Sequence, residues 1–594
     1  MPFDQIVVAG VILFLIIALY RNLLGPGFTF MIGIAVLGIF GILSPKEMLH
    51  GFANEQLAVI IILLLIGEVI RRSTLLDSFF DKFFNNTHSY KKFIFKLIFP
   101  VSALSAIINN TPLVAIIMPY VLKWGKNHNI APSKLLIPLS YAAILGGTAT
   151  LIGTSTNLVV NGMVEDQQII PGFTSLTIFD FTPVGVSMIV FGGLYLIFAS
   201  YRLLPDRKDP LENVALRSRE YLVEVKVGKG SDYHQKTVEE ANLRNLKGLF
   251  LVEIIRNDKS ISPVRPHTMI FEEDYLIFAG NTDTIADMIE NNNALKPSQL
   301  GMFSRRNKTS IVEVVVSPNS GLIEKTVKQT GFRGRYDAAI IAIHRNGERL
   351  RGKIGEITLL PGDLLLLITG EDFEERMDSK DFYILNRVRK IDKMKTSQSL
   401  LIAGGLLLSI TLSSLNIFPL FKSLVVFLIV LFLTKMASPK DIHKSINYNL
   451  VMIIALSLAL GTAIIKSGMA SDLSNFFISV FKPYGIFSIF IGIFILTNLL
   501  ASVITNIGAV AVVFPVAISL AAQLGVDPKP FALLVAYAGA ASFITPIGYQ
   551  TNLMVYGPGG YNFKDFMKIG LPMTIIFMLV ATLGLIIQFG LHIN

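Results

Sequence analysis

The sequence predicts an α-helical polytopic membrane protein in which a soluble α+β segment separates two related membrane halves. Three observations lead to this prediction. The 594 residues are 52% hydrophobic and only 16% charged, whereas soluble domains carry about 25% charged residues. Long runs without Asp, Glu, Lys or Arg flank a charge-rich middle segment. Short polar motifs recur in the two flanks in the same order.

Charge-free runs locate the spanning elements, because a helix needs about 20 mostly apolar residues to cross the hydrocarbon core. Leu57–Ile70 is short and contains one glutamate, and we count it as a span because Arg71 and Arg72 follow it at once. Ser423–Thr434 is also short and is counted because it corresponds to Asn22–Pro45 in the repeat described below. The other runs are Gln5–Tyr20, Leu135–Val164, Phe181–Tyr201, Thr396–Phe421, Ser445–Ile465, Pro530–Phe563 and Ile569–Asn594.

The middle segment, residues 202–395, is rich in charges and alternates predicted strands with turns. Residues 220–227 and 311–316 alternate apolar and polar side chains, as half-buried strands do. Each is followed by a turn, a polar stretch that we expect to be helical, and two further strands. Because this order occurs twice, we predict two tandem modules, residues 206–300 and 301–395.

These modules resemble the RCK_C domains of potassium-conductance regulators. The resemblance is carried by Pro361–Leu367, which reads PGDLLLL, and by the turns at Arg256–Asp258 and Arg345–Gly347. It implies regulatory domains that dimerise and bind a small ligand, a nucleotide or an ion. An unrelated cytoplasmic spacer is the alternative.

The membrane part is predicted to be duplicated, with the first repeat at residues 1–205 and the second at 396–594. Three pairs of motifs recur at nearly one separation along the chain. The pairs are Ile108–Pro119 (INNTPLVAIIMP) with Ile504–Pro515 (ITNIGAVAVVFP), Thr150–Asn157 (TLIGTSTN) with Thr545–Asn552 (TPIGYQTN), and Ser44–Lys46 with Ser438–Lys440.

An odd number of crossings in the first half predicts that the second half is inverted. Most Lys and Arg residues of the loops then fall on one side, with residues 206–395, and we assign that side to the cytoplasm. The net charge of +10 belongs to these loops and does not indicate a nucleic-acid partner. We therefore expect a multi-pass protein of the cell membrane. The exceptions to the bias are Lys46, Lys422, Lys466, Lys482 and Lys529.

Both halves contain a polar break inside an apolar stretch. Pro483–Val526 is too long for one span and contains Thr505–Gly508 near its middle, and Asn109–Pro112 interrupts the first half in the same way. A break at this depth is tolerated only where it is buried in protein or lines a cavity. We therefore predict two re-entrant hairpins with polar tips, near residues 93–125 and 484–524.

A second pair of breaks predicts two unwound helices. Thr150–Asn157 is interrupted by Gly153, and Thr545–Asn552 by Pro546 and Gly548. Broken helices in both halves are typical of secondary transporters. Their carbonyl, amide and hydroxyl oxygens suit sodium, and their helix N-termini suit an anion. The alternative is that these Asn, Ser and Thr side chains only join helices.

The hairpin tips resemble those of the divalent anion/sodium symporters (DASS) of the ion transporter superfamily, which carry a Ser-Asn-Thr triplet at each tip. Here the tips read Asn109-Asn110-Thr111 and Thr505-Asn506-Ile507. The substrate residues that the resemblance implies are Asn109, Asn110, Thr111, Thr505, Asn506, Thr150, Thr545 and Pro546. The sodium residues that it implies are Ser105, Asn109, Asn110, Ala149, Gly153, Ala501, Thr505, Asn506, Ile544 and Gly548.

The resemblance implies a homodimer in the lipid bilayer that carries a small divalent anion together with sodium by an elevator-type movement, regulated by the cytoplasmic domains. The tips depart from the triplet, and Ile507 removes one contact to a substrate carboxylate. This favours a compact oxyanion such as sulfate, as does the central pair of modules. A dicarboxylate or citrate symporter and an oxyanion exporter remain as alternatives.

Two other classes are disfavoured by what the sequence lacks. A cation channel regulated by RCK domains would need a carbonyl filter of the TVGYG kind, and an antiporter would need Asp or Glu in the membrane centre. The charge-free runs supply neither. We predict no enzymatic activity, because no nucleophile–base pair or pair of carboxylates lies in these runs. The chain has no cysteine, which excludes disulfides.

Overall fold

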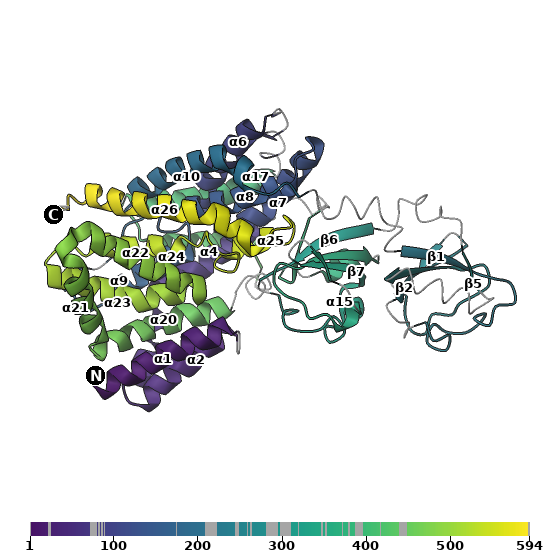
Figure 1. Cartoon of the computed structure of the whole chain (residues 1–594), viewed down its shortest axis with the longest axis horizontal. Helices are drawn as coiled ribbons and strands as arrows, with labels where there is room; N and C mark the ends of the chain where they lie inside the picture. The colour runs from purple at the N-terminus through teal and green to yellow at the C-terminus, as the bar shows by residue number, and fades with distance from the viewer. Residues whose placement is uncertain are drawn as a thin grey trace.

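The computed structural model consists of a helical body and two β-sheet modules that project from one end of it (Figure 1). Both chain ends lie on the far side of the body from the sheets (Figure 1). The structure describes residues 2–21, 25–71, 80, 83–84, 87, 89–173, 175–207, 222–243, 249–257, 259–261, 264–280, 295–297, 310–318, 320–345, 348–350, 353–370, 372–377, 380–385, 396–415, 417–438 and 448–591.

The expectation of a mostly helical, polytopic membrane protein is confirmed. Within the described ranges, eight helices are long and apolar enough to cross a membrane. The first flank contains α1 (Phe3–Tyr20), α2 (Pro26–Ile39), α3 (Pro45–His50), α4 (Glu55–Arg71), α6 (Tyr90–Ser105), α7 (Asn110–Asn127), α8 (Leu136–Gly147), α9 (Ser155–Asp166) and α10 (Thr182–Leu203).

The second flank follows the sheets. It contains α17 (Thr396–Ser414), α18 (Leu420–Leu433), α20 (Tyr448–Lys466), α21 (Met469–Phe481), α22 (Gly485–Val503), α23 (Asn506–Leu524), α24 (Lys529–Ala540), α25 (Gln550–Tyr556) and α26 (Phe563–Gln588). At 14 residues each, α2 and α18 are shorter than a full crossing. Of the Ser438–Lys440 motif, Pro439 and Lys440 lie outside the described residues.

Helices of the two flanks contact one another in matching pairs. α2 packs against α20, and α18 packs against α4. α9 packs against α24, and α25 packs against α8. The long helices α10 and α26 lie side by side (Figure 1). Each flank therefore completes the packing of the other.

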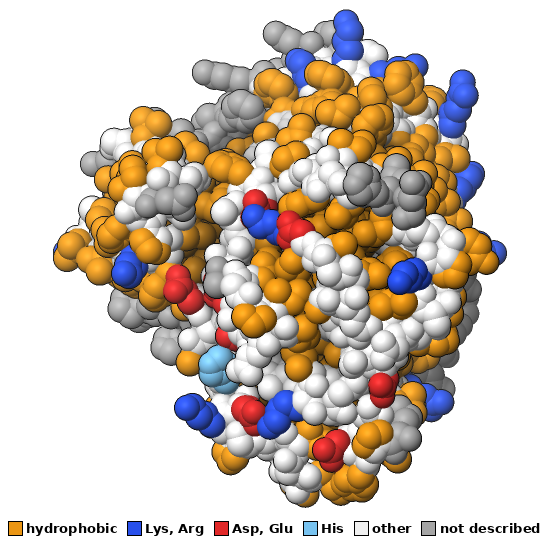
Figure 2. Space-filling view, turned by 90° about the vertical axis from the view of Figure 1, so that its left-hand side faces the viewer, with side chains coloured by type: hydrophobic (Ala, Val, Ile, Leu, Met, Phe, Trp, Pro, Cys, Tyr) orange, Lys and Arg blue, Asp and Glu red, His pale blue; other side chains and the backbone are white. Residues whose placement is uncertain are grey.

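Large apolar side chains remain exposed on the outside of the body. Examples are Leu13, Phe198, Leu408, Val426 and Ile587. A soluble monomer rarely exposes so many, whereas lipid-facing helices do. Figure 2 shows the end of the molecule opposite the sheets, where charged side chains are few and scattered among hydrophobic and uncharged ones.

Two helix starts show how the sequence fixes the ends of these elements. Ser44 and Glu47 form a capping box at α3, and Asn562 and Asp565 form one at α26. In each, a side chain satisfies a backbone N–H that the first helical turn leaves without a partner. Arg207, at the end of the first flank, binds the same Asp565 at 2.6 Å and so ties the two flanks together.

The two modules have five-stranded sheets with equivalent strand orders. The first sheet has the order β3-β2-β4-β1-β5 and the second the order β10-β6-β9-β7-β8, which is the same order read from the other edge. The strands are β1 (Leu222–Val227), β2 (Leu249–Arg256), β3 (Lys259–Ile261), β4 (Tyr275–Gly280), β5 (Leu295–Pro297), β6 (Ser310–Val316), β7 (Ala338–Arg345), β8 (Glu348–Arg349), β9 (Leu364–Thr369) and β10 (Phe382–Ile384).

A buried ion pair recurs at equivalent positions of the two sheets. Arg256 lies 2.8 Å from Asp274, and Arg345 lies 2.7 Å from Asp363. The two aspartate side chains are 1% and 0% exposed. The motifs noted in the sequence thus have a structural basis in this pair, because Arg345 and Asp363 belong to the RNG and PGD turns. Asp258, Asn346 and Gly347 lie outside the described residues.

The polar helix expected after the first strand is not found in the described residues 228–243 of the first module, which form turns. In the second module a short helix stands at this place, the five-residue α15 (Phe332–Tyr336), and α16 (Phe373–Arg376) follows β9. In the first module, Thr237 and Glu240 exchange the same side-chain hydrogen bonds as the capping box at α3, so the start signal of a helix is present. Thr237 also forms an isolated bridge with Met269, and the chain after it forms turns.

Candidate functional site

The first hairpin consists of α6 and α7, joined by a short turn at residues 106–109. Asn109 caps α7, because its side-chain oxygen accepts the Thr111 N–H at 3.3 Å. Ser105 Oγ lies 2.5 Å from Asn110 Oδ1 and 2.7 Å from the carbonyl oxygen of Ala143. Ser105 and Asn110 are fully buried, at 0% and 1% exposure. The tip therefore lies inside the protein and does not face lipid.

The second hairpin consists of α22 and α23. Thr505 caps α23 by accepting the Gly508 N–H at 3.0 Å, and Asn506 Oδ1 accepts the Ser542 hydroxyl at 2.9 Å. The side chain of Ile507 is buried among apolar neighbours and takes no part in the polar tip. Ala501, on α22, is also buried.

The first unwound segment, residues 148–154, joins α8 to α9. The Thr150 hydroxyl donates to the Ala106 carbonyl at 2.5 Å, which ties the segment to the first hairpin. The Asn157 amide donates to the Thr150 carbonyl at 2.8 Å. A Cβ on Gly153 would lie 2.5 Å from the Gly147 carbonyl oxygen, so only glycine fits there.

The carbonyl of Ala149 is held by α10. It accepts the Thr182 hydroxyl at 2.9 Å. Next to this bond, Gly185 of α10 lies so close that a Cβ would come within 2.5 Å of the Ala149 Cα. The backbone oxygens of this segment are thus fixed by side chains rather than by helical hydrogen bonds.

The second unwound segment, residues 541–549, joins α24 to α25. The Asn552 amide donates to the carbonyls of Ser542 at 2.8 Å and Thr545 at 3.2 Å, as Asn157 does in the first half. Thr545 Oγ1 accepts the Gly548 N–H at 3.1 Å. Of the other predicted residues, Pro546 is buried and Ile544 is half-buried.

The first hairpin tip meets the second unwound segment. Asn110 Nδ2 donates to the Tyr549 hydroxyl at 2.6 Å, and Thr111 Oγ1 donates to Gln550 Oε1 at 3.1 Å. The Tyr549 hydroxyl also lies 3.0 Å from Thr154 Oγ1, at the end of the first unwound segment. Residues far apart in the sequence are therefore brought together at one place.

The second hairpin tip meets the first flank at Gly539 of α24. A Cβ on Gly539 would lie 3.2 Å from Thr156 Cγ2 on α9 and 3.6 Å from the Asn506 carbonyl oxygen. Nearby, the Ser140 hydroxyl of α8 donates to Asn552 Oδ1 at 2.7 Å. Both hairpin tips thus contact elements of the opposite flank.

Sequence analysis did not single out Tyr549 and Gln550. Both stand in the TPIGYQTN motif, directly after Gly548, which was predicted to interrupt the helix. The motif was a usable signal, but the partner of each side chain could not be read from it.

The groups that meet at this site are hydroxyls, amides and backbone carbonyls. Such oxygens are ligands for hard cations, and such N–H and O–H groups bind anions. The described tips and unwound segments contribute no Asp, Glu, Lys or Arg. The site can therefore bind an anion together with a cation only by neutral dipoles.

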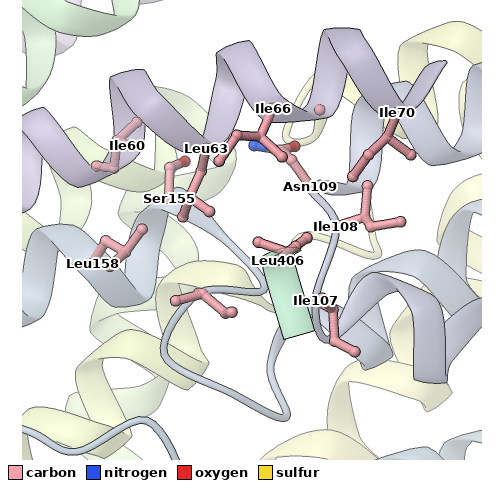
Figure 3. Close-up of a pocket in the computed structure, with 12 residues that line it drawn as sticks. Ile60, Leu63, Ile66, Ile70, Ile107, Ile108, Asn109, Ser155, Leu158 and Leu406 are labelled. Atoms are coloured by element: carbon pink, nitrogen blue, oxygen red, sulfur yellow. The ribbon is translucent and has the colours of Figure 1, made fainter. Parts of the chain in front are cut away.

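A small pocket lies beside the first hairpin tip (Figure 3). Its wall includes Ile60, Leu63, Ile66, Gly67 and Ile70 of α4, and Leu406 of α17. Asn109 and Ser155 are the polar side chains of its lining. The pocket is thus mainly apolar, and it separates the tip from α4 and α17.

Polytopic helices, two hairpins and two unwound segments that meet across the flanks define a membrane transporter. The chain belongs to the citrate transporter family, CitMHS, whose family model matches residues 11–498 and 484–590.

Similarity to known proteins extends over nearly the whole chain. A Chlamydomonas reinhardtii protein provisionally named as a sulfur deprivation response regulator is 31% identical over 91% of this chain and 94% of its own length. An uncharacterized transporter of Synechocystis sp. is 30% identical over 98% and 97%. Sodium/sulfate cotransporter 2 of C. reinhardtii is 23% identical over 94% and 86%. The family and these transporters are not enzymes.

Proposed function

We propose that the protein is a secondary active transporter that carries a small divalent anion, with sulfate favoured, together with sodium. The observation that carries the proposal is the contact of Asn110 with Tyr549, which joins the first hairpin tip to the second unwound segment. The relative named as a sodium/sulfate cotransporter supports both the anion and the co-ion.

The composition of the site supports sulfate among the divalent oxyanions. Sulfate is fully ionised at neutral pH and needs only hydrogen-bond donors. Phosphate carries a proton that needs an acceptor, and the described tips and unwound segments offer only neutral acceptors and no carboxylate. The carboxylate arms of a longer dicarboxylate would need a second set of contacts, and the apolar, buried side chain of Ile507 at the second tip offers none.

The matching helix pairs support an inverted repeat. α2–α20 corresponds to α18–α4, and α9–α24 corresponds to α25–α8. In an inverted repeat, one rigid group of helices moves against the other around a fixed site. The apolar wall of α4 beside the first tip supports an elevator-type movement, because a surface without polar bonds can slide at low cost.

The contact between the second module and α25 supports regulation by the cytoplasmic domains. A Cβ on Gly557, directly after α25, would lie 2.2 Å from the Gly362 carbonyl oxygen in the PGD turn. α25 is only seven residues long, so its length of about 10 Å is all that separates Gln550 from the end of the helix that the PGD turn contacts. A ligand of the RCK_C-like domains would change transport only if it binds more tightly to one of two conformations that differ at this contact.

Citrate is the second candidate, because the matching family is described as a citrate transporter. A thermal-shift screen of the purified protein separates the two. Sulfate, citrate, a dicarboxylate and phosphate are each added with sodium or with potassium. A ligand that binds only the folded protein raises the unfolding midpoint.

We expect the largest rise for sulfate in sodium. A larger rise for citrate would identify citrate, rather than sulfate, as the substrate. Equal shifts in sodium and potassium would contradict the coupling to sodium.

A further inference from the structure

The hydroxyl of Tyr549 lies between the first hairpin tip and the start of α9. Asn110 Nδ2 donates to it at 2.6 Å, and Thr154 Oγ1 lies 3.0 Å away. An amide nitrogen only donates, whereas a phenol oxygen can accept one bond and donate its own hydrogen to another group. Tyr549 Oη therefore accepts from Asn110, and either hydroxyl of the Tyr549–Thr154 pair can donate to the other.

This bond selects one direction of the Asn110 amide when the Tyr549 hydrogen is donated to Thr154, because Oη then only accepts. With Nδ2 held by Tyr549, Oδ1 points to the opposite side and lies 2.5 Å from Ser105 Oγ. The reverse orientation would turn an N–H2 group towards Ser105. That group repels a cation, whereas the amide oxygen attracts one.

Ser105 has more acceptors in reach than it has hydrogens. Its Oγ lies close to both Asn110 Oδ1 and the Ala143 carbonyl oxygen, at 2.5 and 2.7 Å, and one hydroxyl hydrogen serves one of them at a time. When that hydrogen turns to Ala143, Ser105 Oγ and Asn110 Oδ1 present lone pairs to the same buried space. A cation bound to both oxygens would then offset the repulsion between these lone pairs.

We propose that Tyr549 is a positioning residue that sets the sodium affinity of the first hairpin by holding the Asn110 oxygen towards Ser105. The inference rests on the sodium coupling of the proposed function and deepens it. It makes the cation site of the first half depend on a side chain of the second half. Movement of the second unwound segment then weakens sodium binding at the first hairpin.

The test is Tyr549→Phe, which removes the acceptor and keeps the ring. The unfolding midpoint of the purified protein is measured against sodium concentration, with potassium holding the ionic strength constant and without any anion substrate. We expect the sodium concentration for half of the maximal rise to increase about tenfold, as for the loss of one hydrogen bond to a buried group. Tyr556→Phe, at the other end of the short helix α25 that Tyr549 precedes, is the matched control and should leave the sodium response unchanged.

Repeating the test in an Asn110→Asp variant separates a positioning role of Tyr549 from a role in packing alone. In Asn110→Asp, a carboxylate offers an oxygen to Ser105 in either orientation. Adding Tyr549→Phe to Asn110→Asp should therefore cause no further loss of sodium response. A role in packing alone would produce the same loss in both backgrounds, which would overturn the inference.

Two outcomes separate this inference from the proposed function. If sodium does not stabilise the wild-type protein more than potassium does, the sodium coupling fails, and the inference fails with it. If the wild type responds and Tyr549→Phe responds equally, only the inference fails. Should Tyr549→Phe not fold, Thr154→Val tests the same network, and a sodium response like that of the wild type would overturn the proposal.

Discussion

Ser105 and Ser102 occupy the same face of α6, one turn apart, in different surroundings. Both are 0% exposed, and each hydroxyl bonds to a carbonyl of α8. Ser105 also reaches Asn110 of the tip, whereas the hydrogen bond recorded for Ser102 is to Ala142. The pair therefore separates a hydroxyl that faces the site from one that only joins two helices.

Ser105→Ala should raise the sodium concentration for half-maximal thermal stabilisation by about tenfold, because one of the two oxygens is removed. Ser102→Ala should lower the unfolding midpoint, because it removes the buried hydrogen bond to Ala142, but it should not change the sodium response. Thermal unfolding in sodium and in potassium measures both. A shift of the sodium response in Ser102→Ala as large as in Ser105→Ala would contradict the assignment.

Ile507→Thr restores the residue type of the family triplet at the second tip. Because the side chain at this position is buried among apolar neighbours, the new hydroxyl lacks a polar partner. We expect a loss of about 1–3 kcal/mol of stability and no gain of dicarboxylate binding. Denaturant unfolding and the anion screen measure the two effects. A stabilised variant that binds a dicarboxylate would show that the position faces the substrate.

At the scale of elements, the unwound segments depend on close backbone approaches. Gly153 lies against the backbone of Gly147, and Gly570 of α26 lies against the carbonyl of Phe543 in the second segment. Backbone atoms cannot move aside as a flexible side chain can, so a Cβ at either glycine opens the segment. The glycines thus hold carbonyl oxygens in fixed positions.

Gly153→Ala should lower the unfolding midpoint by several degrees and reduce the anion-dependent shift, because the Cβ would lie 2.5 Å from the Gly147 carbonyl oxygen. Gly10→Ala, in α1, has nothing within 4 Å of its Cβ and should be neutral or slightly stabilising. Both are measured by thermal unfolding with and without sulfate in sodium. An unchanged anion shift in Gly153→Ala would contradict a role of this segment in binding.

The position of the polar breaks could be predicted from the sequence, but their contacts could not. Asn109 and Thr505 are good cap residues at the start of apolar stretches, and such breaks are a local signal. Tyr549 contacts a residue 439 positions away, and no local pattern contains such a pair. The helix expected after β1 was wrong for residues 228–243 for a related reason, because the bridge of Thr237 with Met269 joins residues that no local pattern connects.

At the scale of the whole molecule, two glycines lie close together where the second module meets the helical body. Gly362 has a φ of +82° in its turn, and its carbonyl oxygen lies against Gly557. The same Gly362 faces the Leu553 carbonyl on α25, at 2.7 Å from an added Cβ. The second module therefore contacts the short helix that begins with Gln550.

Gly557→Ala should separate the module from α25 and change the transport rate, because the Cβ would lie 2.2 Å from the Gly362 carbonyl oxygen. Gly334 lies in the second module, and a Cβ added to it would have nothing within 4 Å, so Gly334→Ala should transport like the wild type. Sulfate uptake into proteoliposomes measures both variants. If both Gly557→Ala and a folded chain without residues 210–390 took up sulfate at the wild-type rate, regulation of transport by the modules would be contradicted.

The apolar pocket beside Asn109 has a consequence for water. Its lining is mainly Ile and Leu, and its space is too small for a drug-sized compound. A water molecule there would find only the side chains of Asn109 and Ser155 as polar partners among the lining residues. The wall between α4 and the hairpin tip is therefore expected to exclude water, which keeps the hydrogen bonds of the tip strong.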